Sequence, residues 1–225
     1  KGCAELLLEN NAIVIGLDIC EPEILNAKYE HKIVDIRNEE EIECAINEIE
    51  NHYSQIFGLV NCAGINSIKK PFFEISLDEW NNLISINLTG TFLVAKYVCK
   101  NMILNKTGKI VNISCIRSRI FKKNMAEYSA SKGGVVALTS SMAIDLAPYN
   151  IQVNSVAPGL TSTKMTEKII KNNSLVEEEF NNMIPQKRMA KPKDIANVVL
   201  FLLSDSSKYI TGETIFADGG FSISK

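Results

Sequence analysis

Short, uninterrupted apolar runs alternate along the chain with longer segments in which apolar residues recur every three or four positions. The short runs are typical of strands buried on both faces, and the spacing of three or four is typical of amphipathic helices. Their alternation predicts a doubly wound (Rossmann-like) α/β fold, in which helices flank both faces of a parallel sheet. The predicted strands are 12–17, 31–36, 56–61, 109–114, 151–157 and 214–217, and the predicted helices are 39–54, 77–104, 127–148 and 192–204.

We expect residues 1–225 to form one domain, because the chain has neither a linker rich in Pro, Gly or Ser nor an internal repeat. The segment 164–191 is long and polar, and it is a candidate lid over a substrate. The chain begins with the pattern of a helix already under way, without a capping residue before it.

The composition excludes several classes of function. Lys and Arg number 24 and Asp and Glu 26, so the formal charge is −2, and a nucleic-acid binder of this size would usually show a basic excess. No run of 18 apolar residues predicts a transmembrane helix, and the N-terminus lacks the layout of a signal peptide. Six cysteines lie between positions 3 and 115 without a CxxC pair, which favours reduced thiols over zinc ligands or disulfides. We therefore expect a cytoplasmic protein that binds neither nucleic acid nor membrane.

Polar and turn-forming residues follow five of the predicted strands. Because ligands of such sheets bind beyond the carboxyl ends of the strands, these residues are expected to converge on one edge. Each of them alone also has a structural explanation, since Asp and Gly commonly form turns. The residues are Asp18, Asp35, Asn61-Cys62-Ala63-Gly64, Ser114-Cys115 and Pro158-Gly159.

Tyr128 and Lys132 are four residues apart in a predicted helix, so they share one face. An ammonium near a phenol lowers its pKa from about 10, which would make Tyr128 a usable general acid and base. The pair alone is a weak signal, but Ser114 and Cys115 end a strand 14 and 13 residues earlier. Asn87 is a further polar residue, set between apolar neighbours in a predicted helix.

These residues together resemble the short-chain dehydrogenase/reductase family, from the first residue of the chain to the last. The resemblance implies a dinucleotide-binding, catalytic domain that interconverts a secondary alcohol and a ketone, similar to 3-oxoacyl carrier-protein reductases and to sugar and hydroxysteroid dehydrogenases. It also implies a homo-oligomer, a dimer or a tetramer, that acts on a small-molecule substrate. The motifs that carry it are Asn61-Cys62-Ala63-Gly64, Ile86-Asn87-Leu88, Ile110-Val111-Asn112-Ile113-Ser114, Tyr128-Ser129-Ala130-Ser131-Lys132, Asn154-Ser155-Val156-Ala157-Pro158-Gly159 and Asp218-Gly219-Gly220.

The resemblance assigns roles to the catalytic candidates. Tyr128 would donate or accept the proton, Lys132 would lower its pKa and bind the nicotinamide ribose, and Asn87 would hold a water of a proton relay. The family's catalytic serine aligns with Cys115, whose thiol is a weaker donor than a hydroxyl. Either Cys115 serves less well, or a shift of one residue lets Ser114 serve, which we favour; Cys115 is then a packing residue.

The resemblance also assigns the cofactor contacts. Asp18 would bind the adenosine ribose and repel a 2′-phosphate, so NAD is expected rather than NADP. The family's TGxxxGxG phosphate loop is absent from these 225 residues, so the chain is either a fragment that lacks the first strand and this loop or a damaged copy. The remaining cofactor candidates are Ile19, Asp35, Ile36, Asn61, Ala63, Gly64, Tyr128, Lys132, Pro158, Gly159, Thr161 and Thr163.

Two questions stay open at this point. A basic loop after Cys115, with Arg117, Arg119, Lys122 and Lys123, favours an anionic or carrier-bound substrate or is simply a solvated loop. The alternative to an enzyme is a non-catalytic protein that keeps the fold and acts through oligomer contacts. The helices 77–104 and 127–148 carry surplus apolar residues for such contacts, among them Phe92, Leu93 and Val94.

Overall fold

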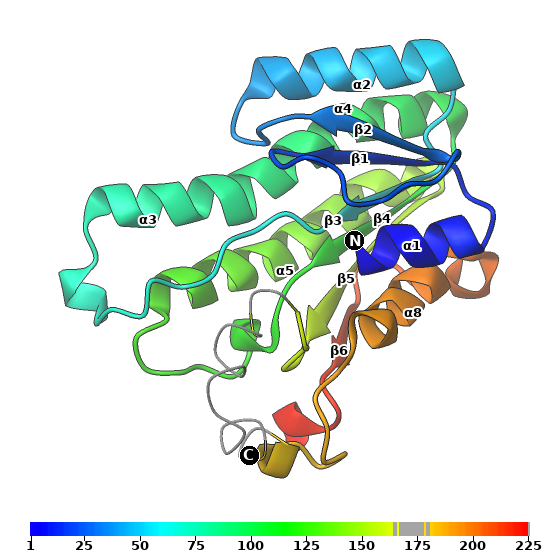
Figure 1. Ribbon diagram of the computed structural model, residues 1–225. Coiled ribbons are helices and arrows are strands. Elements are labelled where there is room, and N and C mark those ends of the chain that lie inside the picture. Colours follow the sequence, from blue (N-terminus) through cyan, green and yellow to red (C-terminus); the bar gives the residue numbers. More distant parts are fainter. Residues whose placement is uncertain (164–165, 167–177, 179–180, 225) are drawn as a thin grey trace.

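The computed structural model describes residues 1–163, 166, 178 and 181–224, and Figure 1 shows the order of the elements. Most of the predicted lid lies outside these residues. The helices are α1 (Gly2–Glu9), α2 (Glu39–Tyr53), α3 (Leu77–Ile84), α4 (Thr91–Asn105), α5 (Ala126–Leu146) and α8 (Pro192–Leu203). The strands are β1 (Val14–Asp18), β2 (Tyr29–Ile33), β3 (Gly58–Asn61), β4 (Gly108–Ile113), β5 (Ile151–Pro158) and β6 (Thr214–Ala217).

Every strand pair is parallel, which confirms the predicted class of sheet. The strands nevertheless form two sheets: β1 pairs with β2, while β3, β4, β5 and β6 pair in that order. Among the described residues no ladder joins β1 to β3, although both point the same way (Figure 1). All carboxyl ends therefore still lie at one side of the molecule.

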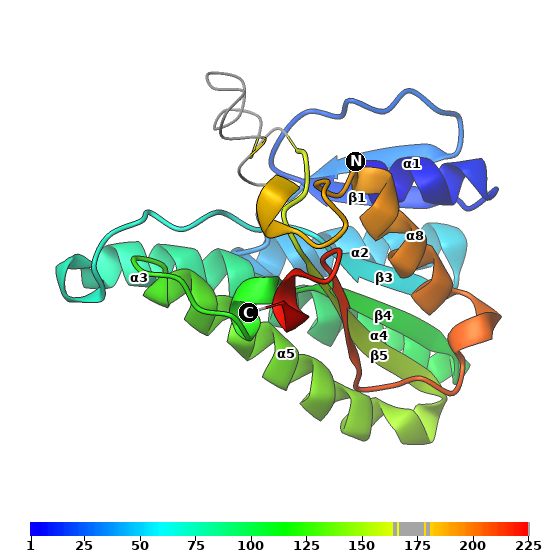
Figure 2. The same cartoon turned by 90° about the horizontal axis from the view of Figure 1, so that it is seen from below.

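Helices cover both faces, and the apolar residues of the strands alternate between two cores. Ile110 of β4 packs in the core formed with α2, α4 and α5, whereas Val111 packs in the core formed with α8. Leu7 of α1 joins the second core, and α1 lies beside α8 in Figures 1 and 2. This alternation follows from the period of two in a strand, and it fixes which residues reach the end of the sheet.

The predicted helix 77–104 is interrupted by a π-helical segment, η2 (Ser85–Gly90), between α3 and α4. Such segments insert an extra residue into a helix and are frequent at functional sites. The predicted strand 31–36 is also displaced, since β2 ends at Ile33 and the chain turns before α2. The first difference is a local change of helix type, and the second is a shift of a few residues; the helical stretch and the strand themselves are present.

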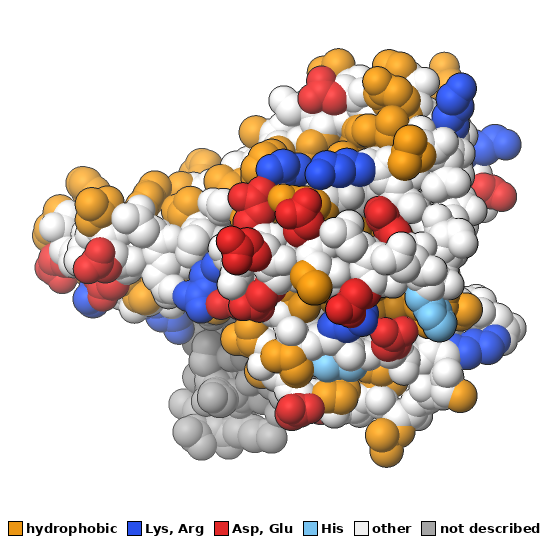
Figure 3. All heavy atoms as spheres, turned by 90° about the horizontal axis from the view of Figure 1, so that it is seen from above, with side chains coloured by type: hydrophobic (Ala, Val, Ile, Leu, Met, Phe, Trp, Pro, Cys, Tyr) orange, Lys and Arg blue, Asp and Glu red, His pale blue; other side chains and the backbone are white. Residues whose placement is uncertain are grey.

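The apolar surplus lies elsewhere than expected. Leu93 and Val94 are buried in the core, so of the three residues named in α4 only Phe92 is exposed. Exposed apolar side chains gather instead around η1 (Phe72–Glu74) and α3, on the projecting end at the left of Figure 3. They are Phe72, Phe73, Leu77 and Trp80. None of the helices in the described part of the chain is long and apolar enough to cross a membrane.

Candidate functional site

The first turns of α5 are fastened to the end of β4 by two hydrogen bonds. The Lys132 ammonium donates to the carbonyl of Ile113 at 2.8 Å, and the Ser114 hydroxyl donates to the carbonyl of Lys132 at 2.9 Å. Both side chains are buried. Burial lowers the pKa of Lys132, because the ammonium has lost most of its water. The spacing of Tyr128 and Lys132 thus places both at the end of the sheet, as their sequence positions predict.

Cys115, and not Ser114, lies beside Tyr128. The Cys115 thiol interacts with the Tyr128 hydroxyl and raises its pKa, whereas the Ser114 hydroxyl is turned toward the main chain of α5. Successive residues at the end of a strand point to opposite sides, so only one of the two can face the phenol. The structure therefore argues against our preference for Ser114 as the residue that faces the substrate.

Burial raises the pKa of Tyr128 above its ordinary value, and the neighbouring Cys115 raises it further. The charge that opposes this shift belongs to Arg117, whereas we expected the Lys132 ammonium to lower the pKa. The difference has a structural reason: the Lys132 ammonium is directed at the carbonyl of Ile113.

Asn87 fastens the segment after β3 to the π-helical segment. Its side chain accepts from the amide of Ile65 at 2.8 Å and donates to the carbonyl of the same residue at 3.0 Å. A second donation reaches Ser131 of α5 at 3.3 Å. Asn87 is fully buried, so these bonds account for a polar side chain among apolar neighbours. Gly64 is held against this cluster: a Cβ there would lie 3.1 Å from Asn87 Oδ1 and 3.6 Å from Lys132 Nζ.

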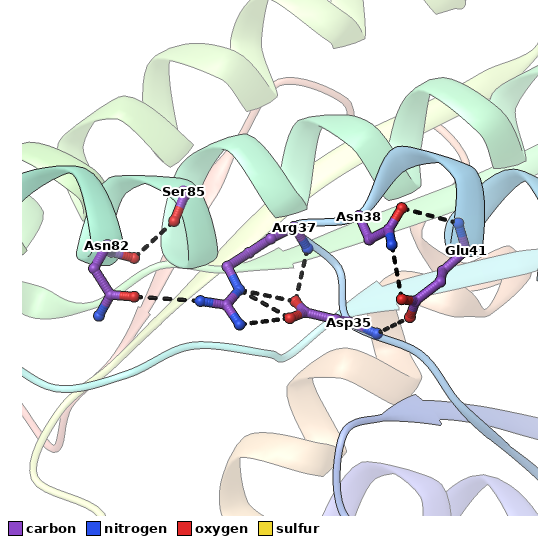
Figure 4. A network of polar contacts seen from close by, with 6 residues as sticks. All are labelled: Asp35, Arg37, Asn38, Glu41, Asn82 and Ser85. Carbon is purple, nitrogen blue, oxygen red and sulfur yellow. Dashed lines mark hydrogen bonds and ion pairs between the residues drawn. The ribbon is translucent and has the colours of Figure 1, made fainter.

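The two carboxylates expected near the adenosine, those of Asp18 and Asp35, differ in their interaction partners. Asp18 ends β1, and among the described residues its carboxylate accepts one hydrogen bond, from the amide of Cys20 at 3.1 Å. Asp35 is ion-paired to Arg37 at 2.5 Å, and the hydrogen bonds from Arg37 lower its pKa (Figure 4). The same guanidinium reaches Asn82 of α3 at 3.4 Å, so Asp35 belongs to a network that joins the loop after β2 to α3.

Other predicted cofactor residues have structural partners. The Asn61 side chain donates to Asn112 at 2.9 Å, inside the sheet, so its amide is not directed at the edge. Ile19 is 65% exposed, Ala63 is also exposed, and Ile36 lies where a Cβ on Gly90 would be. These residues lie at or shortly after the ends of β1, β2 and β3, and the sequence did not show that the Asn61 amide bonds within the sheet.

The segment after β5 packs on the closing glycine motif. The amide of Gly159, which follows Pro158, donates to Ala217, and a Cβ at Gly159 would lie 2.7 Å from the Cα of Asp218. The Thr161 hydroxyl donates to the carbonyl of Gly159 at 3.1 Å, and the Thr163 hydroxyl lies 3.4 Å from that of Thr166. The end of the predicted lid is joined to this segment through main-chain bonds between 160–162 and Ala190.

Comparisons with known proteins agree with this arrangement. The family model described as enoyl-(acyl carrier protein) reductase matches residues 1–222. A 3-oxoacyl-(acyl-carrier-protein) reductase of Aquifex aeolicus is 40% identical over 187 residues, which are 83% of this chain and 74% of the relative. The chain belongs to the short-chain dehydrogenase/reductase family. It is thus an oxidoreductase of the class that uses NAD or NADP.

Solved structures of this family superpose over almost the whole chain. Ligand-free aldohexose dehydrogenase of Thermoplasma acidophilum has a TM-score of 0.93 at 33% identity and covers 99% of this chain and 89% of its own. A gluconate 5-dehydrogenase of Burkholderia cenocepacia, in complex with NADP and tartrate, has a TM-score of 0.90 at 30% identity. The matched regions are 99% of this chain and 90% of that one.

The strand-end residues of this short-chain dehydrogenase/reductase fit a dinucleotide. Asp18 offers a carboxylate without a cationic partner among the described residues, and Gly64 leaves an edge without a side chain next to Asn87 and Lys132. No cluster of His, Cys, Asp or Glu in the described ranges could hold a metal ion. The donor set therefore suits a nicotinamide cofactor and a proton donor.

Sequence reasoning missed two features of the site. The basic loop was singled out as a whole, but nothing in it showed that Arg117 alone acts on Tyr128. Cys62 was read as part of a motif, whereas its thiol is within hydrogen-bonding reach of Cys3 in α1. The position of Arg117 two residues after Cys115 is the signal that could have indicated the first. The second brings together residues 59 positions apart, for which the sequence held no signal.

Proposed function

We propose that this protein transfers a hydride between NAD(H) and a secondary alcohol or ketone, with Tyr128 as the general acid and base. The observation that carries the proposal is the juxtaposition of Tyr128, Cys115 and Lys132 at the end of β4. A protein that acted only through oligomer contacts would not need a phenol, a thiol and an ammonium gathered at one strand end.

Each side chain has a chemical task in the proposal. A bound nicotinamide supplies or accepts the hydride. Burial raises the pKa of Tyr128, so at neutral pH the phenol carries the proton that the oxygen of a ketone would receive. The Cys115 thiol donates a weak hydrogen bond to the same oxygen. The Arg117 charge opposes the raised pKa and favours the phenolate that remains, while Lys132, held by Ile113, would bind the nicotinamide ribose.

The residues that would hold the cofactor lie along the strand ends. Asp18 would bind the adenosine ribose, Gly64 would border the cofactor beside Lys132, and Thr161 and Thr163 would contact the carboxamide. The free carboxylate of Asp18 favours NAD, because it would repel a 2′-phosphate. The gluconate 5-dehydrogenase in complex with NADP supports the alternative preference for NADP, and the cofactor preference of Asp18→Asn distinguishes the two.

Substitution of the phenol tests the proposed reaction. Tyr128→Phe should lower kcat by about 10²- to 10⁴-fold with a panel of ketones and NADH, since only the proton donor is lost. Tyr149→Phe is the matched control, because Tyr149 is exposed in a turn after α5. Undiminished turnover in Tyr128→Phe would refute the mechanism. Absence of any NADH oxidation by the wild type would favour the non-catalytic alternative.

The two residues at the end of β4 are separated by a second pair of variants. Cys115→Ser should raise kcat severalfold, because a hydroxyl is a stronger donor than a thiol. Ser114→Ala should instead lower the melting temperature, because the carbonyl of Lys132 loses its partner. The reverse assignment, in which Ser114 faces the substrate, requires that Ser114→Ala lower kcat with little change in stability.

A further inference from the structure

Arg117 lies at the edge of the site, in the short helix η3 (Ile116–Ser118) that directly follows Cys115. This helix packs on α5, which carries Tyr128. Arg117 therefore follows by two residues the thiol that interacts with Tyr128, and its charge opposes the raised pKa of that phenol. The two neighbours of Arg117 in this helix have structural roles. Ile116 is buried in the core, and the Ser118 hydroxyl donates to the carbonyl of Cys115.

Arg117 differs from the other three arginines in its partners. Arg37 is ion-paired to Asp35, Arg188 is ion-paired to Asp194, and Arg119 lies over the ring of Phe216 at 5.4 Å. Arg117 donates one hydrogen bond, to the carbonyl of Ile120 at 3.2 Å. In the part of the chain that the structure describes, no carboxylate pairs with it.

This combination points to an anionic ligand. Arg117 is half-buried, and a cation that has lost part of its water is stabilised when an anion completes its coordination. A guanidinium offers five donors in a planar fork, of which the bond to Ile120 uses one. The remaining donors suit a planar carboxylate, which accepts two parallel hydrogen bonds.

We propose that Arg117 binds a carboxylate of the substrate, so that the protein acts on oxo acids and the corresponding hydroxy acids. The inference rests on the proposed function, because it takes the reacting oxygen to lie between Tyr128 and Cys115. Arg117 then holds the acid group at the far end of the substrate and selects charged over neutral ketones. The proposal distinguishes Arg117 from Arg119, which is exposed and stacked on Phe216.

Matched pairs of substrates that differ only in charge test this role. The rate of NADH oxidation is measured with a series from 2-oxo to 5-oxo acids and with the methyl ester of each acid. The wild type should show a higher kcat/KM for at least one acid than for its ester. In Arg117→Gln this acid-to-ester ratio should fall about 10- to 100-fold, chiefly through KM, because a charge-assisted pair is lost. Arg119→Gln should keep the wild-type ratio, and Arg117→Lys should recover part of it.

Each outcome has one meaning. A ratio that is unchanged in Arg117→Gln, or that falls equally in Arg119→Gln, overturns the inference while the proposed function stands. An equal loss for acids and esters, with the pH profile of kcat displaced upward, also overturns it and shows that Arg117 acts only on the pKa of Tyr128. If the wild type reduces no acid and no ester but reduces another ketone of the panel, the inference fails and the proposed function stands; if it reduces no ketone at all, both fail.

A second measurement does not need turnover. Cys115 interacts with Tyr128 and precedes Arg117 by two residues, so a bound oxo acid should slow its alkylation by iodoacetamide, as followed by peptide mass spectrometry. The methyl ester should protect Cys115 less than the acid, and Arg117→Gln should remove this difference. Equal protection by acid and ester in the wild type contradicts the proposal.

Discussion

Asn87 and Asn101 fasten the two ends of the β3 segment to the same long helix, and their replacement by alanine gives a paired prediction. Asn87 exchanges two hydrogen bonds with the main chain of Ile65, after β3. Asn101 of α4 does the same before β3: it accepts from the amide of Ile56 at 2.9 Å and donates to the carbonyl of Ser54 at 3.1 Å. Both side chains are buried.

The magnitude follows from these bonds. Each variant loses three neutral hydrogen bonds, because Asn87 also donates to Ser131 and Asn101 also accepts from Asn105. At about 0.5–1.5 kcal/mol for each bond, the free energy of unfolding should fall by about 1.5–4.5 kcal/mol. For a chain of this size that loss corresponds to a drop in melting temperature of about 3–18 °C. Asn87→Ala and Asn101→Ala should therefore be destabilised by similar amounts, as measured by urea unfolding and calorimetry.

Activity separates the pair. Asn87 holds the residues beside Gly64 and Lys132, so Asn87→Ala should also lower kcat when it is assayed well below its melting temperature. Asn101 holds the opposite end of the strand, so Asn101→Ala should keep the wild-type kcat. Unfolding of Asn87→Ala at the wild-type urea midpoint would refute the account of its hydrogen bonds. Equal losses of kcat in both variants would show that β3 affects the site only through overall stability.

Three further predictions follow from single contacts. Asp18→Asn should raise the ratio of kcat/KM for NADPH to that for NADH by about tenfold or more, because it removes the charge that repels a 2′-phosphate; an unchanged ratio contradicts the NAD assignment. The hydrogen bond with Cys62 lowers the pKa of Cys3 to about 7, so alkylation of Cys3 should be half-maximal near that pH, and Cys62→Ala should move the midpoint upward toward 8.5. A midpoint that stays in place in Cys62→Ala excludes this contact as the cause. Glu127→Ala should cost about 1–3 kcal/mol of unfolding free energy, because the loop after β3 loses two hydrogen bonds, whereas the exposed Asp145→Ala should change it by less than about 0.5 kcal/mol. Equal melting temperatures of these two variants would contradict that assignment.

Much of the site was predictable because its signals are local. The spacing of Tyr128 and Lys132 determines that they share a face of α5, whatever the rest of the fold does. The polar residues after each apolar run likewise mark the carboxyl ends of parallel strands, which meet at one edge. These inferences need only the periods of the helix and the strand.

The sequence did not predict which of Ser114 and Cys115 points toward Tyr128, because successive residues at a strand end point to opposite sides. A register difference of one residue exchanges the faces, and the sequence sets the strand end only to within a few residues. Packing of β4 against α5 decides the matter, because the Ser114 hydroxyl has a carbonyl to bond. The π-helical turn at Asn87 escaped prediction for a related reason, as the apolar spacing on either side of it stays helical.

The sequence by itself determined the class of the fold, the family and the set of residues at the strand ends, because periodicity and motif spacing depend on short stretches of chain. Only the tertiary structure decided which of these groups remain available for chemistry. Asp35 is neutralised by Arg37, and the Asn61 amide is used by Asn112. Within the described residues, the Asp18 carboxylate and the Arg117 guanidinium have no ion-pair partner. The physical reason is that hydrogen bonds and ion pairs form between groups distant in sequence, and their partners become adjacent only when the strands and helices pack.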